Sequence, residues 1–540
     1  MRPPLDASIL NVRRRVLCVV PSYSPSFGTF QNAYPLCGRR VRAFMPPQGI
    51  LVIAAYLPAH WEVRFVDENI APLKDKDLHW AEIVLVSGMH IQREGINAIN
   101  ARAHELGKTT VLGGPSVSGA PDFYPDFDYL HLGELGDATD TLIRTLSSDA
   151  ARPEKQTVLE TKERLPLNQF PIPAYHLTEL DRYFLCSIQF SSGCPYRCEF
   201  CDIPALYGRV PRLKSAEQII AELDAMVSQG GLNAIYFVDD NFIGNRKAAR
   251  ELLPHLIAWQ KRRGYPVQFA CEATLNIANE TETLAMMREA YFCTLFCGIE
   301  TPDLEALHAM KKDQNAKLPI LDSIRKINSY GIEVVSGIIL GLDTDTYETP
   351  QQILDFVDKS NIPILTINLL EALPRTPLYE RLKSEGRLVS VPGRESNVDF
   401  KLPYETVVTA WRECVSRVYE PEAVYARFGH NVEHTYPNRL NLPLTKARAS
   451  AKNLRRALRI ARNLFFKVGV FSDYRQTFWK LCGPLLKQGR IEQVIHVGLV
   501  AHHLISFARE AISGQQNASF YSAKPRQRLG AGTPVVSPAE

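Results

Sequence analysis

The chain has 540 residues, of which 45% are hydrophobic and 22% charged, and its formal net charge is +4. These values exclude a wholly disordered or fibrous chain, and the length predicts three or four domains. The small net charge gives no general reason to expect a nucleic-acid partner. The cysteines number eleven and no signal peptide is visible at the start, so we expect a reducing cytoplasm rather than a disulfide framework.

Short apolar runs separated by helical segments dominate residues 15–150. Strands are predicted at 15–20, 63–67, 82–87, 109–114 and 128–133, with helices at 46–58 and 92–106. This alternation predicts an open parallel sheet covered on both faces, as in a Rossmann-like domain. Residues 1–14 are predicted to be an extension, and residues 151–183, with four prolines and little periodicity, a linker.

A second alternating series follows the predicted linker. Its strands are predicted at 185–190, 234–239, 267–272, 294–299, 333–340 and 364–369. Six βα units predict a partial TIM barrel over residues 184–395, with its chemistry at the C-terminal ends of the strands. Residues 396–514 have a helical pattern, and residues 515–540 are typical of a flexible tail. No run of about 18 uninterrupted apolar residues occurs, so any membrane role is expected to be peripheral.

Three cysteines, Cys194, Cys198 and Cys201, stand in CxxxCxxC spacing directly after the first strand of the second series. Three thiolates so close together suit an iron–sulfur cluster or a metal better than packing. A [4Fe–4S] cluster usually takes four cysteines, so three local ligands leave one iron open to a substrate or cofactor. Structural zinc is the alternative, but only Cys186, inside the strand, and His176 lie nearby as a fourth ligand.

The spacing and its place after the first barrel strand resemble the radical S-adenosylmethionine superfamily. Phe200, before the last cysteine, matches the aromatic position of that motif. The resemblance implies that the open iron chelates the amino and carboxylate groups of S-adenosylmethionine. It also implies that the reduced cluster cleaves this cofactor to methionine and a 5′-deoxyadenosyl radical.

The resemblance further implies contacts to S-adenosylmethionine at later strand ends. Carboxylates and amides at the second strand hold the methionyl amine, Glu300 follows the fourth strand, and glycines of the fifth allow approach of the adenosine. The alternative for each acid is a cap or surface group. The predicted set is Phe200, Asp239, Asp240, Asn241, Glu300, Gly337 and Gly341. We expect Cys271, Cys293 and Cys297 to be core residues, and nominate no catalytic base.

The first domain resembles the cobalamin-binding domain of cobalamin-dependent radical enzymes. The resemblance rests on the stretches MPPQGILVIAAYL, VRFVDENIAPL, VSGMH, LGGPSVSG and HLGELGDA. It implies cobalamin contacts on loops at the C-terminal edge of the sheet, where backbone can approach closely. The residues so implied are Ser87, Gly88, Gly113, Gly114, Gly133 and Glu134. The alternative is an ordinary Rossmann-like domain whose glycines only make turns.

The loop after the first strand departs from many cobalamin domains. They carry DxHxxG there, whose histidine ligates cobalt, whereas this loop reads PSYSPSFGTF and has no histidine. No axial ligand is therefore assigned. If cobalamin binds, its lower face is expected to be empty or to carry water, with its own base displaced.

The C-terminal region is basic, with fifteen Lys or Arg and four Asp or Glu between 425 and 515. In the segment 446–468 an apolar stripe is predicted to face a basic side. The stripe is Leu454, Ala457, Leu458, Ala461, Phe465 and Val468, and the basic side is Arg448, Lys452, Arg455, Arg456, Arg459 and Arg462. The pattern is typical of a peripheral membrane helix, of a helix packed on the barrel with a solvated face, or of nucleic-acid contact.

The whole layout is similar to cobalamin-dependent radical methylases that act on hopanoid lipids, with the closest likeness in SFGTFQNAYPL…VRAFMPPQGILVIAAYLP. The resemblance implies methyl transfer from methylcobalamin to an unactivated ring carbon, the C-2 position, and a low-potential electron donor. An sp³ carbon has no lone pair, which accounts for radical chemistry. Three alternatives stay open: another lipid or natural product as substrate, a non-methylating oxidation or cyclisation, and a metal-binding protein associated with nucleic acid.

Overall fold

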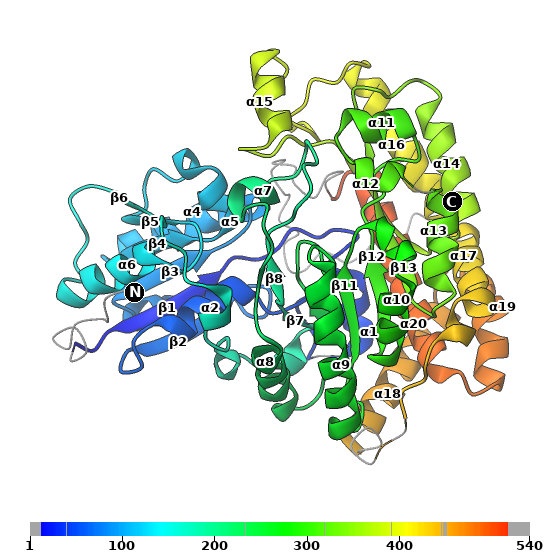
Figure 1. The fold of residues 1–540 in the computed structure, drawn as a ribbon, viewed down its shortest axis with the longest axis horizontal. Helices are drawn as coiled ribbons and strands as arrows, with labels where there is room; N and C mark the ends of the chain where they lie inside the picture. Colours follow the sequence, from blue (N-terminus) through cyan, green and yellow to red (C-terminus); the bar gives the residue numbers. More distant parts are fainter. Residues whose placement is uncertain are drawn as a thin grey trace.

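Two six-stranded parallel sheets and a helical C-terminal region make up the protein (Figure 1). The computed structural model describes residues 12–516 except 39, 233, 318, 390, 392, 444 and 446–450. Nearly all of the predicted extension and tail therefore lies outside the described residues. In Figure 1 the first sheet is at the left, the second in the middle and the C-terminal helices at the right. The predicted α/β fold with a helical C-terminal region is confirmed.

The first sheet has the strand order β2-β1-β3-β4-β5-β6. Its strands are β1 (Arg15–Val20), β2 (Glu62–Asp67), β3 (Ile83–Ser87), β4 (Thr109–Gly113), β5 (Tyr129–Leu132) and β6 (Thr157–Glu160). Five of them lie within two residues of the predicted positions. The sixth, β6, lies within the predicted linker 151–183 and was not among the predicted strands. It is a four-residue edge strand whose residues alternate between half-buried and exposed, so its hydrophobic signal is weak.

Helices cover both faces of the first sheet. They are α2 (Gln48–Tyr56), α3 (Asp75–Trp80), α4 (Arg93–Glu105), α5 (Pro115–Gly119) and α6 (Asp137–Ser148). Side chains of α2 and α6 pack with Val16 and Cys18 of β1, whereas those of α3 and α4 pack with Leu17 and Val19. Because alternate residues of β1 meet different helix layers, the whole apolar run is buried.

The second sheet is a partial barrel with the strand order β14-β13-β12-β11-β10-β7, all parallel. Its strands are β7 (Cys186–Ile188), β10 (Ala234–Phe237), β11 (Gln268–Glu272), β12 (Phe292–Phe296), β13 (Glu333–Leu340) and β14 (Ile364–Leu369). The longer helices between them are α8 (Ala216–Ser228), α9 (Arg246–Arg263), α10 (Thr281–Glu289), α13 (Ile320–Asn328) and α14 (Thr349–Ser360). The six strands lie where they were predicted, and β7 and β14 form the two open edges.

Shorter elements stand at the ends of the barrel strands. They are α7 (Ile203–Leu206), α11 (Leu304–Ala309), α12 (Asp313–Ala316), α15 (Pro377–Ser384) and a two-stranded hairpin of β8 (Ser191–Ser192) and β9 (Arg212–Leu213). Figure 1 shows α7, α11 and α15 gathered at one end of the barrel. These elements follow strands in the chain, so they mark the C-terminal end where chemistry was expected.

Both open edges of the barrel are covered by other parts of the chain. At β7 the hydroxyl of Ser187 donates a hydrogen bond of 2.8 Å to the carbonyl of Pro46. At β14 the indole N–H of Trp411 donates to the carbonyl of Ile367 at 2.8 Å, and the hydroxyl of Tyr419 donates to that of Leu365. The two bonds at β14 satisfy carbonyls of that edge strand, and the bond at β7 ties the other edge to the chain before α2, so in the described part of the chain both edges are covered.

Residues 21–47, here called the N-terminal strap, leave the first domain and pass among the C-terminal helices. Phe27 stacks on Tyr419 at 4.5 Å between ring centroids and meets Phe507 edge-on at 4.6 Å. The amide of Asn32 donates to Glu510 at 2.6 Å. In Figure 1 the strap helix α1 (Tyr34–Cys37) lies beside α20 and behind the barrel. The strap therefore ties all three regions together.

The C-terminal helices are α16 (Tyr404–Val418), α17 (Pro421–His434), α18 (Ala451–Leu464), α19 (Arg475–Lys487) and α20 (Ile491–Ile512), with a π-helix at Phe465–Val470. In the described part of the chain α20 alone is long and apolar enough to cross a membrane. Of its most apolar 18-residue window, 67% is buried inside the protein, which is also typical of a core helix.

The predicted apolar stripe of 446–468 is divided in two by the structure. Val468 is buried together with Ile460 and Leu464, but Leu454 and Leu458 are 58% and 61% exposed. Residues 446–450 and the side chain of Lys452 lie outside the described residues. Helical periodicity identifies an apolar face, but it cannot tell how much of that face a neighbouring helix covers.

Candidate active site

The cysteine loop, residues 193–201, follows β8 at the C-terminal end of the barrel. Gly193 begins it with φ +98°, a conformation that residues with a Cβ rarely adopt. A Cβ there would lie 2.9 Å from the carbonyl oxygen of Gly208, which accepts the Cys194 N–H at 3.2 Å. The Gly193 N–H donates to a carboxylate oxygen of Asp240 at 2.7 Å. The start of the loop is thus fixed by backbone contacts that glycine alone permits.

A half-buried ion pair anchors the middle of the cysteine loop. The guanidinium of Arg381, on α15, binds both carboxylate oxygens of Glu199 at 2.7 and 3.2 Å. The Glu199 N–H donates to the carbonyl of Met310 at 2.9 Å, and its own carbonyl accepts the Leu378 N–H at 3.0 Å. Two-pronged contacts of this kind fix orientation as well as distance. Glu199 was missed by the sequence reasoning because nothing in the motif distinguishes it from a surface residue.

The three cysteines are half-buried, unpaired thiols on this loop. The side-chain amide of Gln314 donates to the sulfur of Cys198 at 3.4 Å. Burial raises the pKa of Cys194 to about 11 and also raises the pKa of Cys201, so without a metal these thiols stay protonated. Coordination to iron removes that proton, since a metal-bound thiol is deprotonated.

A site for one metal ion needs three ligands converging on one point. No group of three His, Cys, Asp or Glu residues does so among the described residues. A [4Fe–4S] cluster places its cysteines on separate irons, so this finding bears on a single-ion site and not on a cluster. The donor set of three thiols on one braced loop fits a cluster.

Lys312 lies beside the cysteine loop although nothing in the sequence pointed to it. Its ammonium is buried, pairs with the carboxylate of Glu300, and stands 5.5 Å from the ring centroid of Phe200. Cys198 and Cys201, together with Glu300, raise its pKa against the opposing effect of burial. A permanent positive charge therefore faces the thiols, where it can balance the negative charge of a thiolate-bound cluster.

Acidic side chains gather at the C-terminal ends of β10 and β11. Burial raises the pKa of Asp239 to about 7, that of Asp240 to about 6 and that of Glu272 to about 7. The carboxyls also raise one another's pKa by mutual repulsion. Such a set is completed by a cationic ligand, which restores the ionised form of each carboxyl. Glu272 was not predicted, because its place beside the others follows from strand register.

Asp239 and Asp240 act first as braces for the neighbouring backbone. Asp239 accepts the N–H groups of Phe190 and Ser191, and Asp240 accepts that of Gly193. Both are therefore held at the cysteine loop by hydrogen bonds that already use part of their acceptor capacity.

The remaining residues predicted to contact S-adenosylmethionine differ in how close they lie to the cysteine loop. The side-chain oxygen of Asn241 accepts the N–H of Thr274 at 3.3 Å, beside Asp240. Gly337 lies near Glu300, whose N–H donates to the Gly337 carbonyl at 2.9 Å. Gly341 has φ +94°, and the ring of Phe400 packs against it and leaves no room for a Cβ. The structure thus brings all but Gly341 near the cysteine loop or Glu300.

Another half-buried acid, Glu371, follows β14 and was also missed. It accepts the Asn397 N–H at 3.2 Å, and burial raises its pKa to about 8. Among the cysteines predicted to be core residues, Cys271 and Cys297 are fully buried and Cys293 is half-buried. None of the three belongs to the cysteine loop.

A cavity of about 440 Å³ opens between the first sheet and the barrel. Its lining includes all six residues predicted for cobalamin: Ser87, Gly88, Gly113, Gly114, Gly133 and Glu134. From the barrel side it is lined by residues that flank the cysteine loop, namely Ser187, Gln189, Leu206, Tyr207 and Val238. The first domain and the cysteine loop therefore face the same space.

The cavity continues along the sheet, under α2 and α6. Its inner wall includes Val16 and Ile83, which lie near the N-terminal ends of their strands, together with Trp61 and Leu146. At its mouth Gly114 has φ +99°, and a Cβ there would lie 2.6 Å from the hydroxyl of Ser87. The shape suits a ligand with a broad head at the sheet edge and an extension that lies along the sheet.

Glu134 connects the first domain with the barrel. Its carboxylate accepts the hydroxyl of Ser192 at 3.0 Å and pairs with Arg212 of β9 and, at 3.5 Å, with Arg164. Ser192 directly precedes the cysteine loop. Glu134 therefore sets the distance between the cavity and the loop, in addition to lining the cavity.

Comparison with known proteins places these observations in a family. Residues 188–357 match the radical SAM superfamily, and residues 376–517 match a domain of unknown function, DUF4070. The chain is 59% identical over 514 residues to the hopanoid C-2 methylase of Rhodopseudomonas palustris, which covers 95% of this chain and 97% of that protein.

Two solved structures share the fold. The cobalamin-dependent S-adenosylmethionine radical enzyme OxsB, with aqua-cobalamin and S-adenosylmethionine bound, superposes with a TM-score of 0.60 at 14% identity over 94% of this chain and 81% of that one. The radical S-adenosylmethionine methyltransferase TsrM of Kitasatospora setae superposes with a TM-score of 0.54 at 16% identity over 71% and 80%.

Proposed function

The chain belongs to the radical S-adenosylmethionine family that includes the hopanoid C-2 methylase, and from this premise we propose that it methylates a hopanoid lipid at C-2. The observation that carries the proposal is the shared cavity. Residues of the first sheet and residues flanking the cysteine loop line one space, which a two-cofactor reaction requires. A methyl donor in the first domain and a radical source on the loop would then meet at one substrate.

The cofactors we propose are a [4Fe–4S] cluster, S-adenosylmethionine and cobalamin. Cys194, Cys198 and Cys201 would hold the cluster, leaving one iron for the amino and carboxylate groups of S-adenosylmethionine. When bound, the reduced cluster supplies the electron that cleaves S-adenosylmethionine, and cobalamin supplies the methyl group. A low-potential electron donor is required to reduce the cluster.

The acidic residues would hold the cationic part of S-adenosylmethionine. Within the described residues Asp240 and Glu272 form no ion pair and burial raises the pKa of both, so an ammonium placed between them gains charge-assisted hydrogen bonds. Glu300, backed by Lys312, and the backbone of Gly337 would position the remainder. Gly341 supports this site indirectly, through its packing on Phe400.

The long cavity of the first domain would hold cobalamin. The backbone at Gly88, Gly114 and Gly133 lines its mouth, where a corrin needs close approach. The cavity's extension along the sheet supports a displaced lower base, as expected from the loop that lacks a histidine. The apolar walls of the cavity would also exclude water from the bound cofactor.

We also propose that α18 contacts a membrane, because a hopanoid substrate would reside there. Leu454, Leu458, Phe465, Phe466 and Phe471 are all exposed to solvent, an arrangement that supports insertion beside basic side chains. In Figure 1, however, α18 lies at the bottom of the barrel, whereas α7 and α15 lie at the top. The contact would therefore hold the enzyme at the membrane without delivering the substrate directly to the cysteine loop.

The test is a lipid mass profile of cells with and without the gene. A hopanoid one methyl heavier, present only with the gene and with the methyl on the ring that contains C-2, is the expected result. Identical lipid profiles, although the purified protein holds iron, sulfide and cobalamin, would show that the acceptor is another compound.

A further inference from the structure

A second cavity, of about 260 Å³, lies far from the cysteine loop, between α18, the N-terminal strap and the segment before β10. Four arginines line it: Arg40, Arg455, Arg456 and Arg459. The other lining residues are Cys37, Val41, Asp181, Gly231 and Asn453. Gly231 precedes β10, so this cavity lies at the N-terminal end of the barrel, opposite the proposed active site.

Local contacts hold two of the four guanidinium groups, and the aliphatic part of a third arginine packs on the N-terminal strap. Arg456 donates to the carbonyl of Gly231 at 2.7 Å. Arg40 pairs with Asp181 at 3.0 Å. The side chain of Arg459 lies so close to Gly38 that a Cβ on that glycine would stand 2.9 Å from its Cδ. Arginines held by their surroundings lose little freedom when a ligand arrives.

The charge in this cavity is not balanced by the described residues. Asp181 is the one carboxylate among the described lining residues, and Glu179, beside the cavity, also pairs with Arg40 at 3.5 Å, so two carboxylates stand against four guanidinium groups. Within the described part of the chain Arg455 and Arg459 have no acidic partner, and both are exposed. Like charges gathered at one small cavity repel, and an anion removes that repulsion.

We propose that this cavity binds a phosphate group. Guanidinium forks match the tetrahedral oxygens of phosphate in pairs, and a phosphate monoester brings nearly two negative charges in a small volume. A carboxylate would neutralise one arginine only. The phosphate can come from a lipid headgroup or from a soluble phosphate compound. The lipid source rests on the membrane contact proposed for α18, whereas the phosphate site itself does not.

The first experiment measures binding of inorganic pyrophosphate to the full-length protein by calorimetry. Arg459→Gln and Arg455→Gln are compared with Arg462→Gln, which removes the same charge from the exposed side of α18 outside the cavity. We expect the two cavity variants to bind about tenfold more weakly or worse, and Arg462→Gln to bind like the wild type. If all three variants weaken pyrophosphate binding equally, with unchanged melting temperatures, the binding comes from a diffuse basic surface and the proposed phosphate site is wrong.

The second experiment identifies the source of the phosphate. Phosphatidylcholine vesicles containing phosphatidic acid are compared with vesicles given the same surface charge by oleate, which has no phosphate. Tighter binding to phosphatidic acid, lost in Arg459→Gln but kept in Arg462→Gln, assigns the headgroup. Pyrophosphate binding without any preference between the vesicles assigns a soluble phosphate compound. If the protein neither binds pyrophosphate nor prefers phosphatidic acid, the phosphate site is refuted. Methylation of detergent-dispersed lipid tests the proposed function separately.

Discussion

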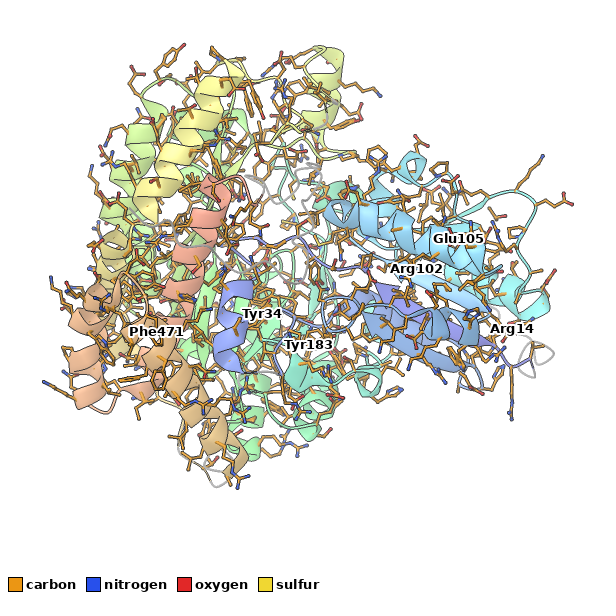
Figure 2. The ribbon with its side chains drawn as sticks, turned by 180° about the vertical axis from the view of Figure 1, so that it is seen from behind. Arg14, Tyr34, Arg102, Glu105, Tyr183 and Phe471 are labelled. Atoms are coloured by element: carbon orange, nitrogen blue, oxygen red, sulfur yellow. The ribbon has the colours of Figure 1, made fainter. Side chains whose placement is uncertain are left out.

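The two parallel sheets offer binding sites of opposite character. The first sheet presents glycine backbone and apolar walls around a cavity, with Glu134 as its acidic residue at the mouth. The barrel presents thiols, buried carboxyls and a buried lysine, with almost every group tied to another. Figure 2 shows the two regions from behind, with Arg102 and Glu105 on α4 of the first domain and Tyr34 on the strap helix α1. One site selects by shape and the other by charge. Changes in volume are therefore expected to affect the first site most, and changes in charge the second.

The largest effect is expected from removing a thiol. Cys194→Ala leaves two ligands on a loop that Asp240, Gly208 and Arg381 still hold, so the protein is expected to fold without a stable cluster. Turnover is expected to disappear, and iron analysis checks the cause. Cys293→Ala, outside the loop, is the control and is expected to keep both iron and activity. Residual turnover in Cys194→Ala would falsify the role of the triplet.

Lys312→Met is expected to have the next largest effect. It leaves the buried carboxylate of Glu300 without its partner, which costs about 3–5 kcal/mol in comparable sites. The loss of a nearby positive charge is also expected to make the cluster harder to reduce. Urea denaturation and a redox titration measure the two effects. Lys312→Arg keeps the charge, so a shifted potential in that variant as well would point to geometry instead.

The buried carboxyls make the ligand-free protein sensitive to pH. The pKa of Glu272 is raised to about 7, so between about pH 4.5 and 7 the folded protein keeps a proton that the unfolded chain loses. Stability is therefore expected to fall as pH rises through that window, by on the order of 1 to 3 kcal/mol. Glu272→Gln is expected to flatten this dependence. Exposed Glu433→Gln serves as the control, and parallel curves for both variants contradict the prediction.

Gly114→Ala tests the site that selects by shape. Its φ of +99° and its contact with Ser87 leave no room for a methyl group, so cobalamin binding is expected to weaken about tenfold. Gly107→Ala is a matched control, because Gly107 also has a positive φ, +66°, but nothing within 4 Å of its Cβ position. Both variants lose stability for the same backbone reason. Equal loss of cobalamin in both would mean that the cavity mouth has no special role.

The smallest effect is expected at the exposed apolar side of α18. Leu458 is 61% exposed, and Leu458→Gln is expected to weaken binding to anionic vesicles about fivefold. Val158, 51% exposed on the edge of the first sheet, provides the control variant Val158→Gln. Flotation of the protein with vesicles measures both. Unchanged flotation of Leu458→Gln would contradict the membrane contact and indicate that α18 is a packed helix with a solvated basic side.

The barrel strands were predicted well because their apolar runs are long and continuous. Strands β13 and β14 have the predicted bounds, whereas β6 was missed because it is a short edge strand whose residues are half-buried at most. The cysteine triplet could be found because its ligands are neighbours in sequence. Glu272 and Lys312 could not be found from the sequence, because both are far from the triplet in the chain. Strand register brings Glu272 to the site, and a turn after β12 brings Lys312 there.

The N-terminal strap has a consequence for synthesis of the protein. Phe27 and Asn32 leave the ribosome long before their partners, since His503 and Glu510 follow them by 476 and 478 residues. At about 5–20 residues per second, the strap waits roughly 25 to 95 seconds for these helices. During that time its aromatic side chains are exposed while the first sheet can already form. The nascent chain is therefore expected to engage chaperones at this segment, and a C-terminal truncation to expose it permanently.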